Sequence, residues 1–399
     1  MIHPANHIFE HTPDTLAAWC GRVGMPPFRA KQILEWVYEK GVADPAKMTN
    51  LSVRDRETLA REMVFVSGDT VRRQAASDGT LKLLVQWRDY GAPSAASQDG
   101  PAGVVALPQL HSPTAGATTD VTPDPTRQTE CVMIPADDRR TACISSQVGC
   151  PVGCKFCASG LGGLDANLSA GRIVEQVWLL RQAMQQDAGG AEFTRITNVV
   201  FMGMGEPLAN LPAVVPATRA ICSLWGHAIS ARKVTISTVG LPRAIEKLAE
   251  QLDMPITLAL SLHAPNDELR RELIPWAEFT TIKDLLAALQ RWFDKTGREV
   301  TLEYTLLRGV NDQPEHARQL ADLSKTLRAN INLIRYNEVV GMPFERPRDE
   351  DVRAFQEYLR SRGVNVHIRA SRGRDIAAAC GQLRHETGDK ARRREAAPR

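Results

Sequence analysis

From residue 141 onward, short apolar runs alternate with longer amphipathic segments, and this alternation limits the fold more than any other feature. The apolar runs predict strands at residues 142–146, 198–202, 233–237, 256–262, 300–306 and 332–336, with 364–369 as a candidate last strand. Helical spacing is present at residues 170–186, 213–224, 242–252, 282–294, 315–327 and 349–362. Six strand–helix units predict an α/β fold whose parallel sheet is curled by right-handed crossovers into a partial (β/α)6 barrel.

The two ends of the chain predict smaller units beside this barrel, which we assign to residues 141–388. Helical spacing over residues 14–63 indicates a small N-terminal helical accessory domain, assigned to residues 1–70. The last residues, 389–399, are strongly basic, and we expect a disordered, solvated tail there.

Residues 71–140 predict a strand pair interrupted by an insert. Residues 81–87 and 131–135 have the composition of strands, and we expect them to pair. Between them, residues 91–128 are rich in Ala, Pro, Ser, Thr and Gly and contain no aromatic residue. A segment of this kind buries too little surface to offset its ordering entropy, so we predict a disordered insert.

Composition excludes several classes of protein. The eight cysteines are unevenly spaced and follow no secretory leader, which argues against a disulfide framework. No run of eighteen apolar residues is present, so we expect no membrane span and a reducing, cytoplasmic location. A net charge of +3 neither requires nor excludes a nucleic-acid partner.

Three cysteines with C-x3-C-x2-C spacing, Cys150, Cys154 and Cys157, are the strongest chemical signal. Thiolates with this spacing can hold three irons of an iron–sulfur cube and leave the fourth open to a ligand. Structural zinc is the weaker interpretation because the next cysteines, Cys143 and Cys131, lie too far back for the usual pairing. Three unrelated buried thiols are the remaining alternative. Glycines beside the thiols favour a cluster, because they let the backbone turn closely around it: Gly149, Gly153 and Gly160.

Glycine and polar residues follow five successive predicted strands, where a barrel places its ligands. The segments are the cysteine motif, GMGEP at 203–207, STVG at 237–240, SLHAP at 261–265 and LLRGVN at 306–311, and a sixth strand runs into Asn337. Packing alone does not explain such repetition. Taken alone, His263 would more often be a hydrogen-bonded turn histidine, so its assignment depends on the other segments.

The cysteine motif, with Phe156 before its last cysteine, resembles the radical S-adenosylmethionine (SAM) superfamily. The resemblance implies a [4Fe–4S] cluster held by the three cysteines, with SAM on the open iron as the source of a deoxyadenosyl radical. By motif position, it also implies SAM contacts at Gly205, Glu206, Ser237, Ser261, Leu262, His263 and Asn337.

Four further motifs resemble the adenine-C2 RNA methyltransferases of the RlmN type, with the C8-specific Cfr type as nearest relatives. The motifs are CVMIPADDRR, ACISSQVGC, GMGEPL and RGRDIAAACGQL, and the likeness covers residues 14–90 and 129–388. It implies that Cys380 accepts a methyl group from SAM, that Glu130 takes a ring proton and that Cys143 resolves a protein–RNA adduct through a disulfide.

The same resemblance implies the partners: 23S rRNA, tRNA methylated 3' of the anticodon, and an electron donor such as flavodoxin or ferredoxin, with the enzyme a monomer. Two departures are Ala377, where an acid is expected, and Cys131, a further thiol beside Glu130 that could compete as the resolving thiol. Two alternative functions remain: a C8 methyltransferase, and a cluster-based redox or iron sensor that binds RNA. The sensor alternative requires no SAM contacts at the strand ends.

Overall fold

The computed structural model describes residues 1–90, 123–187 and 195–383. Most of the predicted insert and all of the predicted basic tail lie outside these residues. The end of the insert was predicted wrongly, because residues 125–127 form a 3-10 turn and Gln128 is buried at the start of a strand. The side chain of Gln128 donates to Gln86, which ties this residue to the preceding strand.

A ten-stranded sheet forms the centre of the molecule, in the order β1-β2-β3-β4-β7-β8-β9-β10-β11-β12. In this sheet, β4 and the strands from β7 to β12 are all parallel and confirm the predicted sheet. They are β4 (Arg139–Cys143), β7 (Asn198–Phe201), β8 (Val234–Thr238), β9 (Thr257–Ser261), β10 (Val300–Leu306), β11 (Ala329–Arg335) and β12 (Val366–Arg369). The first predicted strand was placed too late, since β4 ends at Cys143 and, beyond it, the Ile144 carbonyl and the Ser146 N–H bond to the loop after β7.

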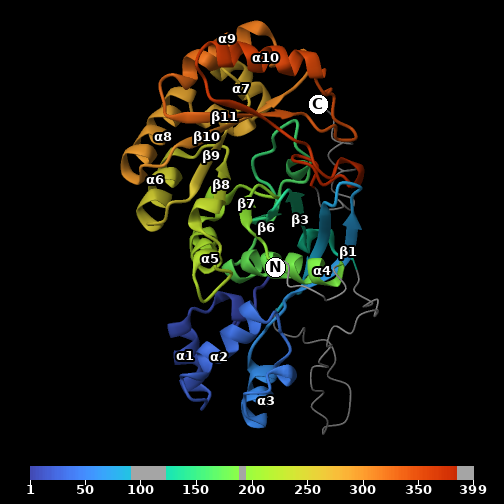
Figure 1. Cartoon of the computed structure of the whole chain (residues 1–399), viewed down its shortest axis with the longest axis vertical. Helices are drawn as coiled ribbons and strands as arrows, with labels where there is room; N and C mark the ends of the chain where they lie inside the picture. Colours follow the sequence, from blue (N-terminus) through green and yellow to red (C-terminus); the bar gives the residue numbers. More distant parts are fainter. Residues whose placement is uncertain (91–122, 188–194, 384–399) are drawn as a thin grey trace, which may run out of the picture.

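Helices cover the outer face of this curved sheet (Figure 1). They are α4 (Ala170–Asp187), α5 (Leu211–Cys222), α6 (Pro242–Gln251), α7 (Asp267–Leu273), α8 (Ile282–Thr296), α9 (Pro314–Ser324) and α10 (Asp349–Ser361). Sequence periodicity missed α7, which has only seven residues and is therefore too short to show a clear period.

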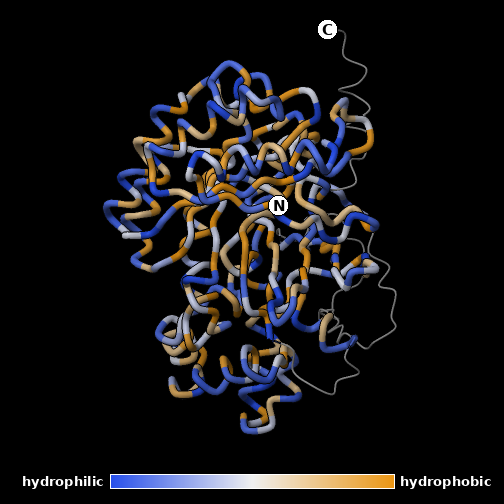
Figure 2. Tube along the Cα trace, turned by 45° about the horizontal axis from the view of Figure 1, so that its top comes forward, coloured by the Kyte–Doolittle hydropathy of each residue, from blue (hydrophilic) through white to orange (hydrophobic). Residues whose placement is uncertain are grey.

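Helix α8 shows how the sequence sets such an element. Thr281 caps its first turn by accepting a hydrogen bond from the backbone N–H of Asp284. Its apolar stripe, which includes Leu285, Leu289 and Trp292, is buried against the sheet. Gly297 ends the helix with a φ of 64°, a conformation that glycine adopts without steric cost. Figure 2 shows the resulting concentration of hydrophobic segments in the interior.

The predicted strand pair is confirmed, and it extends the barrel sheet instead of forming a separate unit. β2 (Leu81–Trp87) pairs antiparallel with β3 (Gln128–Ala136), and β3 pairs antiparallel with β4. A strand that was not predicted, β1 (Gly68–Ala75), forms a hairpin with β2. Its sequence, GDTVRRQA, is largely polar because most of its side chains face solvent.

The N-terminal module contains α1 (Pro13–Arg22), α2 (Arg29–Leu34) and α3 (Val53–Glu62), with a π-helical turn (Glu35–Glu39) extending α2. Leu16, Trp19 and Ile33 are buried in its interior, as the apolar spacing predicts. The helical content of this region is therefore confirmed.

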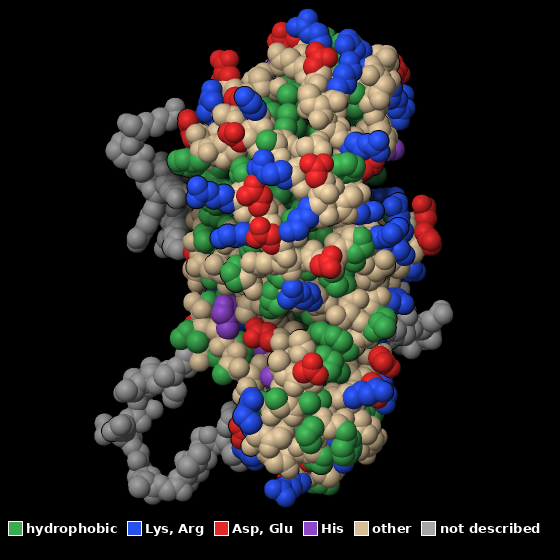
Figure 3. Space-filling model, turned by 90° about the vertical axis from the view of Figure 1, so that its left-hand side faces the viewer, with side chains coloured by type: hydrophobic (Ala, Val, Ile, Leu, Met, Phe, Trp, Pro, Cys, Tyr) green, Lys and Arg blue, Asp and Glu red, His purple; other side chains and the backbone are tan. Residues whose placement is uncertain are grey.

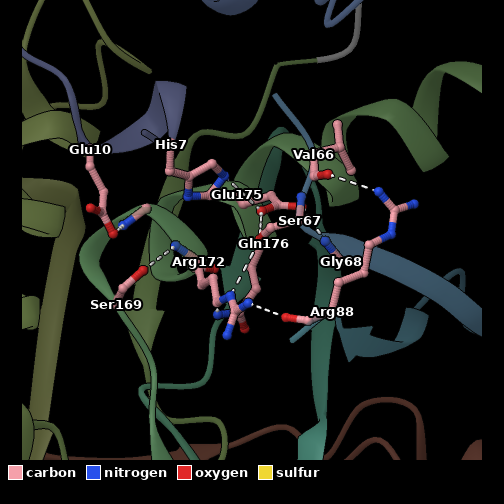
Figure 4. Close-up of polar contacts among 11 residues, drawn as sticks. His7, Glu10, Val66, Ser67, Gly68, Arg88, Ser169, Arg172, Glu175 and Gln176 are labelled. Carbon is pink, nitrogen blue, oxygen red and sulfur yellow. Dashed lines mark hydrogen bonds and ion pairs between the residues drawn. The ribbon is translucent and has the colours of Figure 1, made fainter. Parts of the chain in front are cut away.

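A buried polar network joins this module to the barrel (Figure 4). The Glu175 carboxylate on α4 accepts hydrogen bonds from the backbone N–H groups of Ser67 and Gly68, at 2.8 and 2.9 Å, and from the Ser67 hydroxyl at 2.6 Å. The Nε2 atom of His7 lies 3.1 Å from the same carboxylate. Arg172 of α4 donates to the carbonyl of Arg88 just after β2. One carboxylate thus holds the N-terminal segment and the start of β1 against α4.

Two further features describe the surface. On the face shown in Figure 3, basic and acidic side chains are interspersed over the barrel, which is typical of a solvated surface and not of a phosphate-binding one. Within residues 1–90, 123–187 and 195–383, no helix has the length and apolar character needed to cross a membrane.

Candidate active site

A cavity opens at the carboxyl ends of the parallel strands, where the barrel fold predicts its ligands to lie. Most of the residues predicted to form the site line it together: Cys150, Cys154, Cys157, Gly205, Glu206, Ser237, Ser261, His263 and Cys380. The other four, Cys143, Glu130, Leu262 and Asn337, lie in the surrounding wall or core.

The three motif cysteines are on a loop clasped by a small ribbon, β5 (Gln147–Gly149) and β6 (Leu164–Asn167). Gly149 has a φ of 74°, and an added Cβ would lie 2.0 Å from the carbonyl oxygen of Gly163. Gly160 is equally restricted, because its Cβ would lie 2.8 Å from the Cα of Gly153. The glycines therefore allow the loop to fold tightly, as their pattern predicts.

Desolvation keeps the motif thiols protonated in the metal-free protein. It raises the pKa of Cys150 to about 12 and also raises the pKa values of Cys154 and Cys157. In the described residues, no three His, Cys, Asp or Glu side chains are grouped to hold one metal ion. Three thiols on a folded loop beside a cavity fit a cluster, in which each thiolate binds a different iron.

The loop after β7 runs alongside residues 144–147 at van der Waals distance. The backbone N–H of Gly203 donates to Ile144, and the N–H of Ser146 donates to the carbonyl of Met204. A Cβ on Gly205, whose φ is 106°, would lie 2.7 Å from the Ser146 hydroxyl oxygen. A side chain at this position would clash with Ser146, which explains why the residue is glycine. Without a side chain, the backbone of Gly205 is exposed in the cavity.

Glu206 is buried, and its carboxylate is occupied by the protein itself. One oxygen accepts from the N–H of Leu208 at 3.0 Å, and the other accepts from the N–H of Val239 at 2.8 Å. Burial raises the pKa of Glu206 to about 7, although these hydrogen bonds favour its charged form. The side chain joins the ends of β7 and β8, so its immediate effect is to position the cavity wall.

Two serines on neighbouring strands present hydroxyl groups to the cavity. The Oγ atoms of Ser237 on β8 and Ser261 on β9 lie 3.3 Å apart. Leu262, the next residue, belongs to the hydrophobic core and is fully buried. Its side chain therefore cannot touch a ligand there, whereas its carbonyl accepts from Arg270.

His263 is a neutral hydrogen-bond donor to the cavity. Its Nδ1 accepts from the backbone N–H of Thr305 at 3.0 Å, which places the ring proton on Nε2. Burial, with the charge of Arg270, lowers the pKa of His263 to about 3. The ring packs edge-on against Phe156 at 5.0 Å and so contacts the cysteine loop.

Cys380 reaches the cavity on a C-terminal loop that is bound to the cysteine loop. The N–H of Ala158 donates to the carbonyl of Gly381 at 2.8 Å, and the Ser159 hydroxyl donates to Leu383 at 2.6 Å. Asn337 donates to the Cys380 carbonyl at 3.1 Å. The structure therefore places Asn337 behind the thiol-bearing residue and not on the cavity surface.

Cys143 lies in the wall at the end of β4, in a small apolar cluster with Val132, Met204, Ala378 and Leu383. Burial and the neighbouring Cys380 thiol raise the pKa of Cys143 to about 12, and Arg369 opposes this increase. Both cysteines are free thiols in this structure. Residues distant in sequence thus bring two thiols into one neighbourhood.

Glu130 lies on β3, and its carboxylate is 2.8 Å from the ammonium group of Lys82 on β2. Cys131 is fully buried in the main core and points to the other face of the strand. That orientation favours packing over the competing role as resolving thiol.

Sequence reasoning missed two charged residues of the cavity, Arg369 and Glu303. Arg369 lies 4.0 Å from Glu303 and also opposes the increase in the pKa of Cys380 that desolvation causes. Arg369 was predicted only as the end of a candidate last strand; in the structure it ends β12 (Val366–Arg369) and lines the cavity. A charged residue in the middle of a strand that contains no other charge, β10, was the available signal for Glu303.

Comparisons with known proteins agree with this arrangement. The family described as "Radical SAM superfamily" matches residues 144–321, and "Ribosomal RNA large subunit methyltransferase N-terminal domain" matches residues 7–65. The "Probable dual-specificity RNA methyltransferase RlmN" of Rhodopirellula baltica is 40% identical over 384 residues, covering 96% of this chain and 92% of that protein.

A second relative, the "Dual-specificity RNA methyltransferase RlmN" of Dichelobacter nodosus, is 40% identical over 97% of this chain and 96% of its own length. Among solved structures, a radical SAM methyltransferase from Sphaerobacter thermophilus matches with a TM-score of 0.82 and 37% identity. That match covers 96% of this chain and 100% of the other. The likeness therefore spans both the N-terminal module and the barrel.

Proposed function

Because the chain belongs to the RlmN family of radical SAM RNA methyltransferases, we propose that it methylates C2 of adenosine in 23S rRNA and in tRNA. The observation that carries this proposal is the meeting of Cys380, Cys143 and the three-cysteine loop around one cavity. The names of the relatives favour this activity over the C8 alternative.

We assign cluster binding to Cys150, Cys154 and Cys157, whose thiols line the cavity. A [4Fe–4S] cluster bound there supplies the electron that cleaves SAM and generates a radical. We assign SAM binding to the exposed backbone at Gly205, the hydroxyls of Ser237 and Ser261, and the Nε2–H of His263. All of these are donors or acceptors in the cavity wall. A reduced flavodoxin or ferredoxin is the expected electron donor.

Cys380 is the methyl carrier in this proposal. Its thiol first loses a proton, and the thiolate then attacks the methyl carbon of a SAM molecule, forming an S–CH3 bond as the sulfonium C–S bond breaks and S-adenosylhomocysteine leaves. Arg369 favours the thiolate, since its positive charge opposes the desolvation that raises the pKa of Cys380.

The later steps need a base and a second thiol. Glu130 is proposed to take the ring proton from the adduct in which Cys380 is linked to adenine through a methylene group. The unpaired electron left by the radical addition would return to the cluster that the three motif cysteines would hold. The Cys143 thiolate then attacks the Cys380 sulfur, forming an S–S bond and breaking the S–CH2 bond, whose electron pair takes a proton to complete the methyl group. The resulting disulfide must be reduced before the next turnover.

Methyl-labelled SAM tests this function in the reconstituted protein. Peptide mass spectrometry should find the label on Cys380, and nuclease digestion of treated rRNA and tRNA should give 2-methyladenosine. Label at C8 would support the alternative activity. A protein that never methylates Cys380 would instead fit the sensor hypothesis.

A further inference from the structure

The turn between β1 and β2 contacts the loop that carries Cys380. The backbone N–H of Ser77 donates to the Asp375 carboxylate at 2.9 Å. In the opposite direction, the N–H of Gly373 donates to the Asp78 carboxylate at 3.0 Å. Figure 1 shows the red C-terminal segment beside the ends of these blue strands. Two hydrogen bonds of opposite direction therefore fix this loop against the hairpin.

A third contact comes from Lys82 on β2, a buried residue whose exposed fraction is only 6%. Its ammonium group donates to the carbonyl of Ala377 at 3.2 Å and lies 2.8 Å from the carboxylate of Glu130. Burying an ammonium group is costly unless it is paired and hydrogen-bonded. The same group therefore binds the carrier loop and the assigned base.

The backbone of the loop fits closely against this hairpin. Gly373 has a φ of 66°, and an added Cβ would lie 2.8 Å from the Thr80 side chain. Ala377 has a φ of 50°, a left-handed conformation that costs a residue with a Cβ about 1 kcal/mol. Here the carbonyl of Ala377 points to Lys82. On the far side of Cys380, Gly381 is bound to the cysteine loop, so the segment at 378–380 is held from both ends.

We propose that the β1–β2 hairpin is the docking element of the Cys380 loop, and that Lys82 is a positioning residue joining this loop to Glu130. The inference rests on the proposed roles of Cys380 and Glu130. It assigns a function to a hairpin whose polar first strand and turn give no sign of one. With the loop docked, a single ammonium group fixes the relative positions of the methyl carrier and the base.

Such positioning matters because the sulfur of Cys380 must face three partners in turn: the methyl donor, the adenine ring and the Cys143 thiol. A misplacement of about 1 Å can slow a reaction about 100-fold. Removing Lys82 frees the loop at Ala377 and removes the ammonium group that lies 2.8 Å from the Glu130 carboxylate. Loss of the docking hydrogen bond at Asp78 frees the loop at Gly373 alone.

Hydrogen–deuterium exchange of the full, reconstituted chain measures docking without depending on activity. In Lys82→Met and in Asp78→Ala we expect amides at 373–380 to exchange about tenfold faster, because each variant removes a hydrogen bond between the loop and a charged side chain. The matched control is Gln86→Met, a buried β2 residue that binds Asp124 and Gln128. Native exchange rates at 373–380 in both loop variants would overturn the docking role.

A double variant separates positioning from simple charge balance. In Lys82→Met/Glu130→Gln the negative charge at residue 130 is removed as well, yet the contact with Ala377 is still missing, so the loop should stay as exposed to exchange as in Lys82→Met. Recovery of native protection would show that Lys82 only neutralises Glu130, and the positioning role would fall.

The consequence for chemistry is tested in a Cys143→Ala background, where the RNA adduct should accumulate. We expect Lys82→Met to form adduct about 100-fold more slowly than Gln86→Met. Equal rates would refute the link between docking and reaction. Failure of the native chain to methylate Cys380 would refute the proposed function instead, while the exchange results would still decide whether the loop is docked.

Discussion

Cys380 and Cys143 have different surroundings, and these fit the different roles that we propose for them. Cys380 lies on the cavity surface beside Gly381, whereas Cys143 is enclosed by apolar side chains. An accessible thiol can meet a methyl donor, and an enclosed thiol reacts only when the other sulfur is brought to it. This difference gives an order of events that substitutions can expose.

We predict opposite outcomes for the two alanine variants. Cys380→Ala has no methyl carrier and should form neither adduct nor methylated RNA. Cys143→Ala still carries the methyl group and should trap RNA on the protein as a slowly migrating, nuclease-sensitive band. Denaturing electrophoresis with labelled RNA measures both. Normal release of methylated RNA by Cys143→Ala would transfer the resolving role to another thiol, with Cys131 the first to test.

A second prediction at this scale concerns His263 and pH. Because its pKa is held near 3 in the folded protein and is 6.5 in the unfolded chain, the stability due to neutral His263 is complete above pH 6.5 and is lost as the pH falls. Asparagine offers an acceptor for Thr305 and tolerates the φ of 57° found here. Between pH 6.5 and 5, the unfolding free energy of the native chain should therefore fall by about 2 kcal/mol more than that of His263→Asn.

Urea unfolding of the metal-free protein at several pH values measures this difference. His227→Asn is the useful comparison, since burial also lowers the pKa of His227 to about 3, at a position remote from the cavity lining. Parallel pH curves for His263→Asn and the native chain would contradict the assignment of a buried neutral ring.

At the scale of elements, the β5–β6 ribbon and its loop determine whether a cluster can bind. We expect alanine at Cys150, Cys154 or Cys157 to abolish the brown chromophore and SAM cleavage, because a three-ligand site has no spare thiolate. Iron and sulfide analysis after anaerobic reconstitution measures this loss. Cys222→Ala at the end of α5 is the control and should keep a full iron content. A single motif variant that keeps full iron and cleaves SAM would show that the ligands are misassigned.

At the scale of the whole molecule, the Glu175 network is expected to hold the N-terminal module on the barrel. Glu175→Gln cannot accept all the hydrogen bonds from Ser67 and Gly68, so we expect a loss of roughly 2 kcal/mol in unfolding free energy. We also expect faster proteolysis near Ser67. Calorimetry and limited proteolysis measure these changes.

The matched control is Glu246→Gln, which breaks an exposed ion pair with Arg291. Exposed pairs contribute about 0.5 kcal/mol, so this variant should melt close to the native temperature. Equal effects of the two substitutions would mean that the buried network does not hold the module.

The sequence by itself determined the features that depend on local spacing. The period of the apolar residues predicted the parallel strands and most of the barrel helices, because burial on one face of a strand or helix leaves a regular record. The C-x3-C-x2-C spacing and its glycines likewise predicted a tight thiol loop, since its geometry is set within a few residues.

Only the tertiary structure decided what depends on contacts between distant segments. Glu206 proved to bind backbone amides of β8, Arg369 proved to face the cavity, and Lys82 proved to join the Cys380 loop to Glu130. No local period records such contacts, because each depends on strand order and register across the sheet. The sequence therefore fixes which groups are available, and the fold decides which of them meet.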